Sequence, residues 1–251
     1  TNAPHLGVAR SLPVLNNSRL VPGVVISNNV VNGSGAGAVL FSGAGGTASV
    51  PTSVVPYGRI FNNTFVAGES TAATGIVVEQ EAGPTILNNV FAGFATGVNV
   101  DGGSALNGDG GQRTVISTSA FYNVGTEVAG ATQTQGMTLT TDPFVDRAAG
   151  NFYPTANAPI VDSSRNSLQD RNAYTVVTQP LGIAPSPIVT PTRDLFGQLR
   201  GDDPDQASES GLGLNVFKDR GAIERIDRSA PTARLVGPLD QATQAPLDDK
   251  D

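Results

Sequence analysis

The deciding stretch of this chain is Ile60-Phe-Asn-Asn-Thr-Phe65, one copy of a hexad that reads apolar–x–Asn–Asn–x–apolar. Two further copies are Ile26-Ser-Asn-Asn-Val-Val31 and Ile86-Leu-Asn-Asn-Val-Phe91, and a degenerate fourth is Ile116-Ser-Thr-Ser-Ala-Phe121. The copies begin at residues 26, 60, 86 and 116, about one in every 30 residues. A short repeat of this length with variable spacers is typical of a solenoid, whose loops absorb the differences in length.

A glycine followed by a short alternating run comes after each hexad. The four runs are Gly37-Ala-Val-Leu-Phe41, Gly75-Ile-Val-Val-Glu79, Gly97-Val-Asn-Val-Asp101 and Gly125-Thr-Glu-Val-Ala129. Val, Ile and Thr are frequent and no 3.6-residue apolar period is present, so strands are favoured over helices. Side chains alternate across a strand, so we expect the residues one and three after the glycine to face the interior. These predicted inward pairs are Ala38/Leu40, Ile76/Val78, Val98/Val100 and Thr126/Val128.

The paired asparagines predict a corner and a ladder. Asn tolerates left-handed backbone angles, so Asn-Asn lets a strand turn sharply without glycine. Stacked coils lie about 4.8 Å apart, so equivalent Asn side chains on successive coils can hydrogen-bond to one another. The alternative interpretation is that each Asn-Asn pair marks a separate surface turn.

Composition excludes several classes of function. The 251 residues contain no Cys, which excludes disulfide scaffolds, Cys-based zinc sites and thiol catalysis. A formal net charge of -7 argues against nucleic acid as a partner. No apolar stretch approaches the roughly 18 residues of a membrane span. The chain begins without Met or a signal peptide, so we expect it to be a piece of a longer protein.

These repeats resemble those of the right-handed parallel β-helix proteins of the pectin-lyase-like superfamily. In that superfamily a Gly–apolar–x–apolar run forms one strand, and an Ile-x-Asn-Asn-x-Phe run turns a corner through two others. The resemblance covers residues 21–130. It implies an all-β fold, a right-handed parallel β-helix (solenoid) with a C-terminal loop-rich cap.

A second resemblance concerns the later part of the chain. The stretches that carry it are Asp142-Pro-Phe-Val-Asp146, Gly150-Asn-Phe152, Ala158-Pro-Ile-Val-Asp162, Arg193-Asp-Leu-Phe-Gly-Gln-Leu-Arg200 and Asp219-Arg-Gly-Ala-Ile-Glu224. Together they are similar to the final coils of secreted bacterial β-helix proteins. In those proteins a run of the form Asp-x-Gly-Ala-x-Glu is the last ordered strand.

These patterns divide the chain into four parts. We expect an N-terminal capping segment in 1–20, β-helix coils in 21–135, and final coils with the cap in 136–226. Residues 227–251 resemble a linker followed by the first strand of an Ig-like module. A last coil exposes unpaired backbone and an apolar cross-section, so we expect the Pro-, Asp- and Ser-rich residues 165–215 to form loops over that end.

Aligning the glycine strands gives a candidate site on their outward face. Glu79 and Asp101 fall on adjacent coils, with carboxylates about 5 Å apart given the spacing of strands. Like charges at that distance raise one pKa, and such a pair can divide the roles of acid and nucleophile in glycoside hydrolysis. Asn99, Glu127 and Arg113 lie close enough in the alignment to complete a catalytic or ligand-binding site. The alternative is a plain solvated face.

The loop that follows Asp101 is a candidate calcium site. Asp101, Asn107 and Asp109 are spaced by glycines, and their oxygens suit a hard cation such as Ca²⁺. The spacing matches neither the EF-hand loop nor the calcium-binding nonapeptide repeat. The alternative is a flexible turn between strands. Calcium is the one cofactor that the sequence suggests.

Two functions fit these observations. The first is a non-enzymatic structural or carbohydrate-binding β-helix module of a large secreted or cell-surface bacterial protein. Its partners would be a polysaccharide and the neighbouring modules of the same parent chain. The alternative is the C-terminal half of a polysaccharide lyase or glycoside hydrolase that acts on the Gly-strand face. Against the enzyme, the only histidine, His5, lies in the N-terminal tail, and Lys is absent before Lys218.

Overall fold

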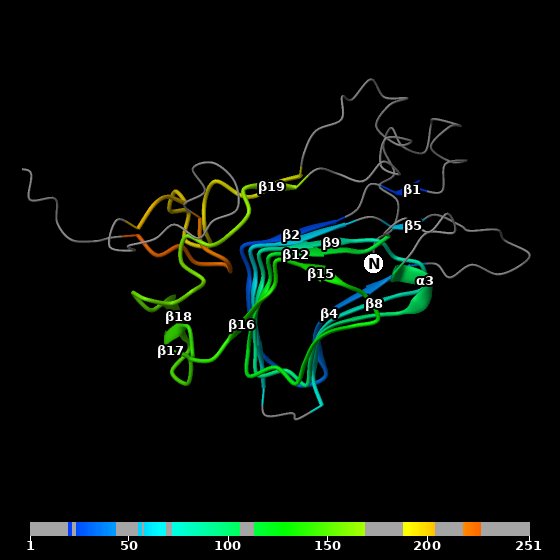
Figure 1. Ribbon diagram of the computed structural model, residues 1–251, viewed down its shortest axis with the longest axis horizontal. Helices are drawn as coiled ribbons and strands as arrows, with labels where there is room; N and C mark the ends of the chain where they lie inside the picture. The colour runs from blue at the N-terminus through cyan, green and yellow to red at the C-terminus, as the bar shows by residue number, and fades with distance from the viewer. Residues whose placement is uncertain are drawn as a thin grey trace, which may run out of the picture.

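Each coil of the fold is made of short strands joined by corners (Figure 1). The computed structural model describes residues 20–21, 24–43, 55–56, 58–68, 72–105, 113–168, 188–203 and 218–226. Three parallel sheets run along the stack, two with five strands and one with four. In Figure 1 the chain turns anticlockwise as successive coils approach the viewer, so the β-helix is right-handed.

The three sheets are numbered here in the order in which the chain visits them. Sheet 1 contains β2 (Val25–Ser27), β6 (Arg59–Phe61), β9 (Thr85–Leu87), β12 (Val115–Ser117) and β15 (Gln133–Thr134). Sheet 2 contains β3 (Val30–Ser34), β7 (Thr64–Ala67), β10 (Val90–Ala92), β13 (Ala120–Tyr122) and β16 (Met137–Leu139). Sheet 3, the sheet of the glycine strands, contains β4 (Gly37–Ser42), β8 (Thr74–Glu79), β11 (Thr96–Val100) and β14 (Thr126–Ala129).

The remaining elements are short. They are the parallel pair β1 (Leu20–Val21) and β5 (Val55–Pro56), helix α3 (Gly102–Ala105), the hairpin of β17 (Phe144–Asp146) and β18 (Asn151–Pro154), and the antiparallel pair β19 (Ser167–Leu168) and β20 (Ile188–Val189). Within the described residues, no helix has both the length and the apolarity that crossing a bilayer demands. Of the predicted outer segments, 1–19 and 227–251 lie outside the described residues.

The predicted asparagine corner and ladder are confirmed. The first residue of each pair adopts a left-handed backbone, with φ of 57° at Asn28, 52° at Asn62 and 56° at Asn88. The second residue of each pair forms an inner ladder. The Asn63 Nδ2 donates to the Asn89 Oδ1 at 3.0 Å, and the Asn63 Oδ1 accepts from the Asn29 Nδ2 at 3.1 Å. The hexad is therefore a corner between sheets 1 and 2.

Stacked apolar side chains fill the interior. The register places Phe65, Phe91 and Phe121 one above another, with ring centroids 5.2 Å and 5.1 Å apart. The isoleucines that begin the hexads stack beside these rings, and Ile60 and Ile86 are completely buried. Identical residues on successive coils therefore build the core, as the repeat predicts.

Sheet 3 differs from the prediction in its first strand. Val39, and not Ala38, pairs with Ile76, so the first strand is shifted by one residue relative to the aligned glycines. Because a shift of one residue reverses every side chain, Leu40 is 66% exposed while Phe41 is buried. The shift places the larger Phe41 ring in the interior, where it lies over Gly58. The predicted inward position of Leu40 is therefore wrong, whereas Ala38 is half-buried and packs against the interior cluster.

The last strand of sheet 3 is also displaced. Thr126 pairs with Thr96, and Val128 pairs with Val98, a displacement of two residues from the alignment of the glycines. A displacement of two keeps the faces unchanged, and Val128 packs against the interior cluster as predicted. Thr126 lies at the exposed start of the strand, so its predicted inward position is wrong.

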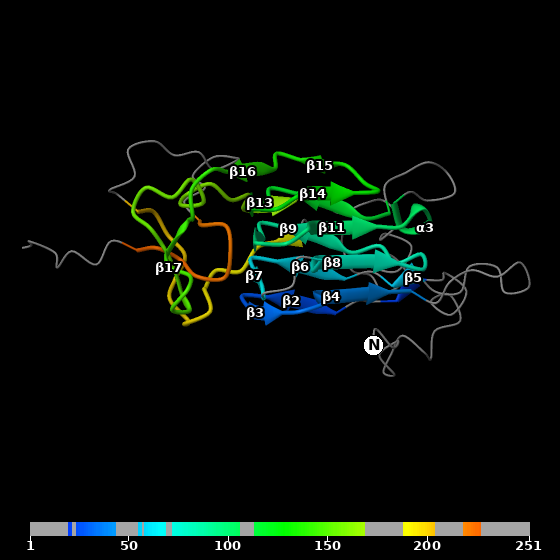
Figure 2. The same ribbon diagram turned by 90° about the horizontal axis from the view of Figure 1, so that it is seen from below.

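The described part of the C-terminal segment packs along the side of the solenoid. Residues 142–165, 193–203 and 218–226 lie against sheet 2 and its corners, spanning the whole height of the stack (Figure 2). We expected 165–215 to lie over the last coil. The physical reason for the difference is that the outer face of sheet 2 is apolar. Its outward residues need cover, and they are Val66, Val90, Ala92 and Ala120, all buried.

The stacking of Ile86 yields a stability test. Ile86→Asp should lower the free energy of unfolding by several kcal/mol, because Ile86 is completely buried between Ile60 and Ile116 and a carboxylate there has no partner. Urea denaturation followed by circular dichroism measures the change. The matched control is Leu40→Asp, which should cost little because Leu40 is 66% exposed. Equal losses in both variants would contradict the register of sheet 3.

Candidate functional site

Asp101 and Glu79 lie on adjacent coils, as the sequence predicts, but the carboxylate of Asp101 has a local role. Val100 pairs with Val78, so Asp101 follows beside Glu79 at the end of sheet 3. Its Oδ1 accepts a hydrogen bond from the Ser104 N–H and its Oδ2 accepts one from the Gln80 N–H, both at 2.7 Å. Asp101 therefore caps the first turn of α3 and ties it to the coil below.

The electrostatics of Asp101 favour a permanent anion. Burial by itself would raise its pKa, but hydrogen bonds from Ser104 and Gln80, together with the charge of Arg113, lower the pKa below its ordinary value. A general acid in glycoside hydrolysis requires the opposite direction. The expectation that a carboxylate pair on this face raises a pKa does not hold for Asp101.

Arg113 lies beside the same turn. It is buried, with its Nη1 at 3.8 Å from the Glu81 Oε2 and 3.4 Å from the Glu81 backbone carbonyl oxygen. Gln80 and Glu81 both have a left-handed backbone, with φ of 54° and 66°. Arg113 thus holds a strained turn in place at the end of β8. The sequence did not single out Glu81, and Gly83 and Pro84 nearby were the signal for a turn there.

The other predicted residues of this face are spread apart. Asn99 is exposed on the outer face of sheet 3, between Val77 and Ala129 of the neighbouring strands. Asn107 and Asp109 of the predicted calcium site lie outside the described residues. Across the described ranges, no three His, Cys, Asp or Glu side chains are grouped so that they could hold a metal ion. Asp101, the described member of that site, receives two backbone N–H donors.

Glu127 closes the end of the solenoid. It stands above Gly97 in the register, and a Cβ at Gly97 would meet the Phe121 ring at 2.6 Å, so this position points inward. Thr138 follows Phe121 in the stack, and its hydroxyl donates to the Glu127 Oε1. The Gln133 Nε2, from sheet 1, donates to the Glu127 Oε2 at 2.9 Å. One carboxylate therefore links all three sheets where the apolar interior ends.

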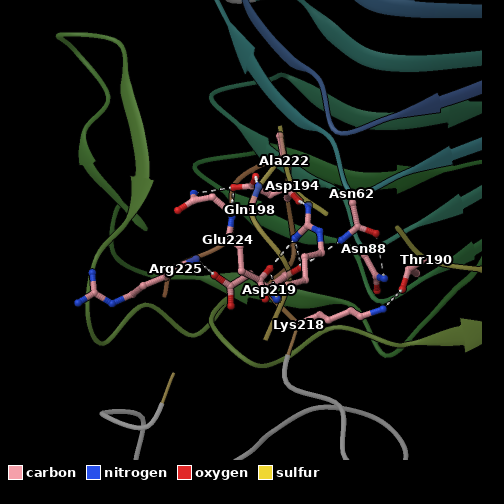
Figure 3. Close-up of polar contacts among 12 residues, drawn as sticks. Asn62, Asn88, Thr190, Asp194, Gln198, Lys218, Asp219, Ala222, Glu224 and Arg225 are labelled. Carbon is pink, nitrogen blue, oxygen red and sulfur yellow. Dashed lines mark hydrogen bonds and ion pairs between the residues drawn. The ribbon is translucent and has the colours of Figure 1, made fainter. Parts of the chain in front are cut away.

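The C-terminal motifs form a buried polar network, which we call the clamp. It consists of Arg200, Asp219, Arg220, Glu224 and their hydrogen-bond partners. Figure 3 shows the part of it around Asp219 and Glu224. The Arg200 Nη1 lies 2.6 Å from the Glu224 Oε2, and both side chains are completely buried. The Glu224 Oε1 accepts from the Gly201 N–H at 2.9 Å, and its Oε2 accepts from the Asp219 N–H at 3.1 Å.

The clamp binds the corner residue of successive coils. In the first coil Arg200 Nη2 donates to Asn28 Oδ1 at 2.9 Å, and in the second Asn62 Nδ2 donates to the Asp219 carbonyl at 3.1 Å. In the third coil Asn88 Nδ2 donates to the Arg165 carbonyl at 2.8 Å. The Arg220 Nη1 reaches the carbonyls of Ser119 and Gln135, at the corners of the fourth coil and the last. The clamp and Arg165, all from the C-terminal segment, therefore contact every coil.

Gly221 and Ala222 let the clamp approach sheet 2 closely. Gly221 has a φ of 95°, and a Cβ there would lie 2.8 Å from the Thr64 Oγ1 and 3.1 Å from Val90. Its N–H donates to the Asn88 carbonyl at 2.8 Å, and the Ala222 N–H donates to the Thr64 Oγ1 at 3.1 Å. Larger residues would separate the clamp from the strands. This contact explains the Gly-Ala pair in the motif.

Burial governs the charges of the clamp. It raises the pKa of Glu224 to about 7, although the Arg200 guanidinium and two backbone N–H donors pull in the opposite direction. Burial and the neighbouring Glu224 raise the pKa of Asp219 well above its ordinary value. Burial lowers the pKa of Arg220 to about 10, so this side chain stays charged at neutral pH. The two carboxyls of the clamp therefore carry protons at a pH where exposed carboxyls have lost theirs.

An open groove lies beside the clamp. It has a volume of about 790 Å³ and runs between the hairpin of β17 and β18, the turn at Leu195 and Phe196, and the outer face of sheet 2. Sequence reasoning did not find this groove. The described residues that line it are Val30, Val145, Gly150, Asn151, Phe152, Tyr153, Leu195, Phe196, Ile223, Arg225 and Ile226.

No family model, no curated protein and no solved structure matches this chain. The contacts within the chain establish a parallel β-solenoid by themselves. Membership of the pectin-lyase-like superfamily rests on the sequence patterns alone.

The role of Glu127 can be tested against that of Glu79. Glu127→Ala should lower the free energy of unfolding by about 1 kcal/mol, because Gln133 and Thr138 lose the acceptor that they share. Glu79→Ala, on the same sheet, should leave stability unchanged. Urea denaturation of both variants at pH 7 provides the measurement. A larger loss at Glu79 than at Glu127 would contradict this assignment of roles.

The clamp predicts a stability that depends on pH. The pKa of Glu224 is raised from 4.5 to about 7 by folding, so the folded state keeps a proton that the unfolded state loses. Stability should fall by up to about 3 kcal/mol as pH rises from 4.5 to 7, and level off above that. Asp219 acts in the same direction, whereas the lowered pKa of Asp101 matters only in more acidic solution.

Urea denaturation at several pH values between 4.5 and 8 measures this slope. In Glu224→Gln the slope should shrink, since that variant has no proton to lose at this position and removes a charge that raises the pKa of Asp219. Glu79→Gln is the control and should keep the slope of the parent chain. A stability that is constant or rises across this interval in the parent chain would contradict the prediction.

Proposed function

We propose that the chain is a non-enzymatic structural module, a rigid β-helix spacer in a large secreted or cell-surface bacterial protein. The observation that carries this proposal is the set of contacts that the clamp and Arg165, all from the C-terminal segment, make with the corner of each coil. Repeats in a solenoid otherwise contact only their neighbours and can open one at a time. A lateral segment that couples all coils suits a module that must stay straight under load.

The state of the candidate catalytic groups supports a non-enzymatic role. Asp101 accepts two backbone N–H groups, Glu127 links the three sheets, and Arg113 holds the turn at Glu81. Each of these side chains has a structural partner that catalysis would have to displace. The alternative function, a polysaccharide lyase or glycoside hydrolase on the Gly-strand face, would depend on the same residues.

The family assignment belongs to the same proposal. The hexad and the final Asp-x-Gly-Ala-x-Glu motif resemble the pectin-lyase-like superfamily, and the motif forms the clamp in this chain. We infer that the chain is a divergent β-helix of that superfamily, and that its neighbouring modules continue the parent protein.

One observation favours contact with a polysaccharide as a second candidate function. The outward side chains of sheet 3 are uncovered at Leu40, which is 66% exposed, and at Asn99. The outer face of sheet 2, by contrast, is covered by the C-terminal segment. A flat strand face with amide and apolar side chains suits an extended sugar chain.

A single screen separates these functions. The full chain is incubated with acidic and neutral polysaccharides, with and without Ca²⁺, while new reducing ends and unsaturated uronate products are followed. The same polysaccharides are immobilised to measure retention of the chain. We expect no turnover. Turnover that disappears in Glu79→Gln or Asp101→Asn would contradict the proposal, and retention that is lost in Asn99→Ala would select the second candidate over a bare spacer.

A further inference from the structure

We propose that the groove beside the clamp is a docking site for a second copy of this chain, which inserts its Phe196 there in a two-fold symmetric pair. This inference goes beyond the spacer role, because the spacer needs no partner at this surface. It concerns the outer face of sheet 2, where the β17–β18 hairpin and the turn at 194–199 line the same groove.

The turn at 194–199 presents apolar side chains to solvent. Phe196 is 67% exposed, Leu199 61% and Leu195 42%. Other large apolar residues of the described part are also exposed, among them Val25 and Leu40, but these three lie together on one short turn. Exposed apolar clusters of this kind are characteristic of surfaces that bind another protein.

A buried carboxylate holds this turn rigid. Asp194 is 5% exposed, and its Oδ1 accepts hydrogen bonds from the N–H groups of Phe196 and Gln198, both at 2.9 Å. Its Oδ2 accepts from the Glu224 N–H at 3.2 Å, which joins the turn to the clamp. The Arg193 guanidinium donates to the Gly197 carbonyl at 2.6 Å. The Phe196 ring is thus held in a fixed place before any partner arrives, which lowers the entropic cost of binding.

The groove beside the turn has room for an aromatic side chain. Its volume is about 790 Å³, and Val145 on the opposite wall is 53% exposed. Arg225 is the charged residue among its described lining, and its Nε already lies 2.8 Å from the Asp203 Oδ2. Among its described lining, the groove therefore presents no unpaired charge to an incoming apolar side chain, while the net charge of -7 on each chain opposes association.

The surface is self-complementary. A projection next to a hollow is what a two-fold interface requires, because each copy offers its projection to the hollow of the other. The exposed parts of Val145, Leu195, Phe196 and Leu199 amount to on the order of 400 Å² per copy, given the size of such side chains. A stable interface buries about 800 Å² per partner, so we expect a weak dimer with a micromolar dissociation constant.

Sedimentation equilibrium of the full chain, over a concentration range from about 1 to 200 µM, tests the pairing. We expect a monomer–dimer equilibrium that strengthens as salt is raised, because salt screens the repulsion between two acidic chains. Phe196→Ser should weaken the dimer about tenfold or more, as loss of a central aromatic anchor does. The matched control is Leu40→Ser, at a site of equal exposure on sheet 3, which should leave the dimer unchanged.

Disulfide trapping tests the geometry, since the chain contains no cysteine of its own. Val145→Cys and Phe196→Cys variants are mixed and oxidised, and the mixed disulfide should form in preference to either homodisulfide. One intact Phe196 contact remains in that pair. A chain that is monomeric throughout, or a dimer that Leu40→Ser disrupts, would overturn the proposal. So would a monomer whose retention on a polysaccharide is lost in Phe196→Ser, because the groove would then bind sugar.

Discussion

The corner between sheets 1 and 2 is the constraint on which the rest of the structure depends. Its first residue has a left-handed backbone, and its second turns its amide inward toward the next coil, as Asn63 does toward Asn89. The two side chains therefore point in opposite directions from one turn. The inner one fixes the spacing of coils, and the outer one is left for the clamp. Asn fits both requirements, because it tolerates the left-handed region and carries both a donor and an acceptor.

The clamp depends on this regularity. Asn28, Asn62 and Asn88 recur once in every coil, in line along the stack. Arg200, Asp219 and Arg165 of the C-terminal segment can therefore contact one asparagine each. Where the asparagine is replaced, the corner geometry persists: Thr118 and Gln135 have φ of 47° and 56°. At these last corners the long Arg220 side chain reaches backbone carbonyls nearby instead of a side chain. The buried ion pair of Arg200 and Glu224 joins the two stretches of chain, 193–203 and 218–226, that form the clamp.

Local periodicity made the coils predictable, and long-range packing did not. The hexads predicted the corner, the ladder and the stacking of Phe65, Phe91 and Phe121, because each follows from a side chain meeting its own copy. The sequence could not predict which side chains of the first glycine strand face the interior, because spacer lengths vary and a glycine does not fix the register of a strand. The lateral position of the clamp had a signal in the apolar residue Val90 within a hexad. An apolar side chain at an outward position needs a covering segment, which sequence spacing cannot locate.

The carboxylates show why the register of strands is a weak guide to chemistry. The sequence correctly placed Asp101 and Glu79 on adjacent coils, but the direction of a carboxylate is decided by the nearest N–H groups. In Asp101 and Asp194 these are backbone N–H groups of a turn, and at Asp101 they favour the charged form of the carboxylate. The acids whose pKa is raised, Asp219 and Glu224, are those that folding buries far from sheet 3. In this chain, therefore, a perturbed carboxyl reports how the solenoid is held together. The exposed apolar turn is held by a different carboxylate, that of Asp194, through the N–H groups of Phe196 and Gln198.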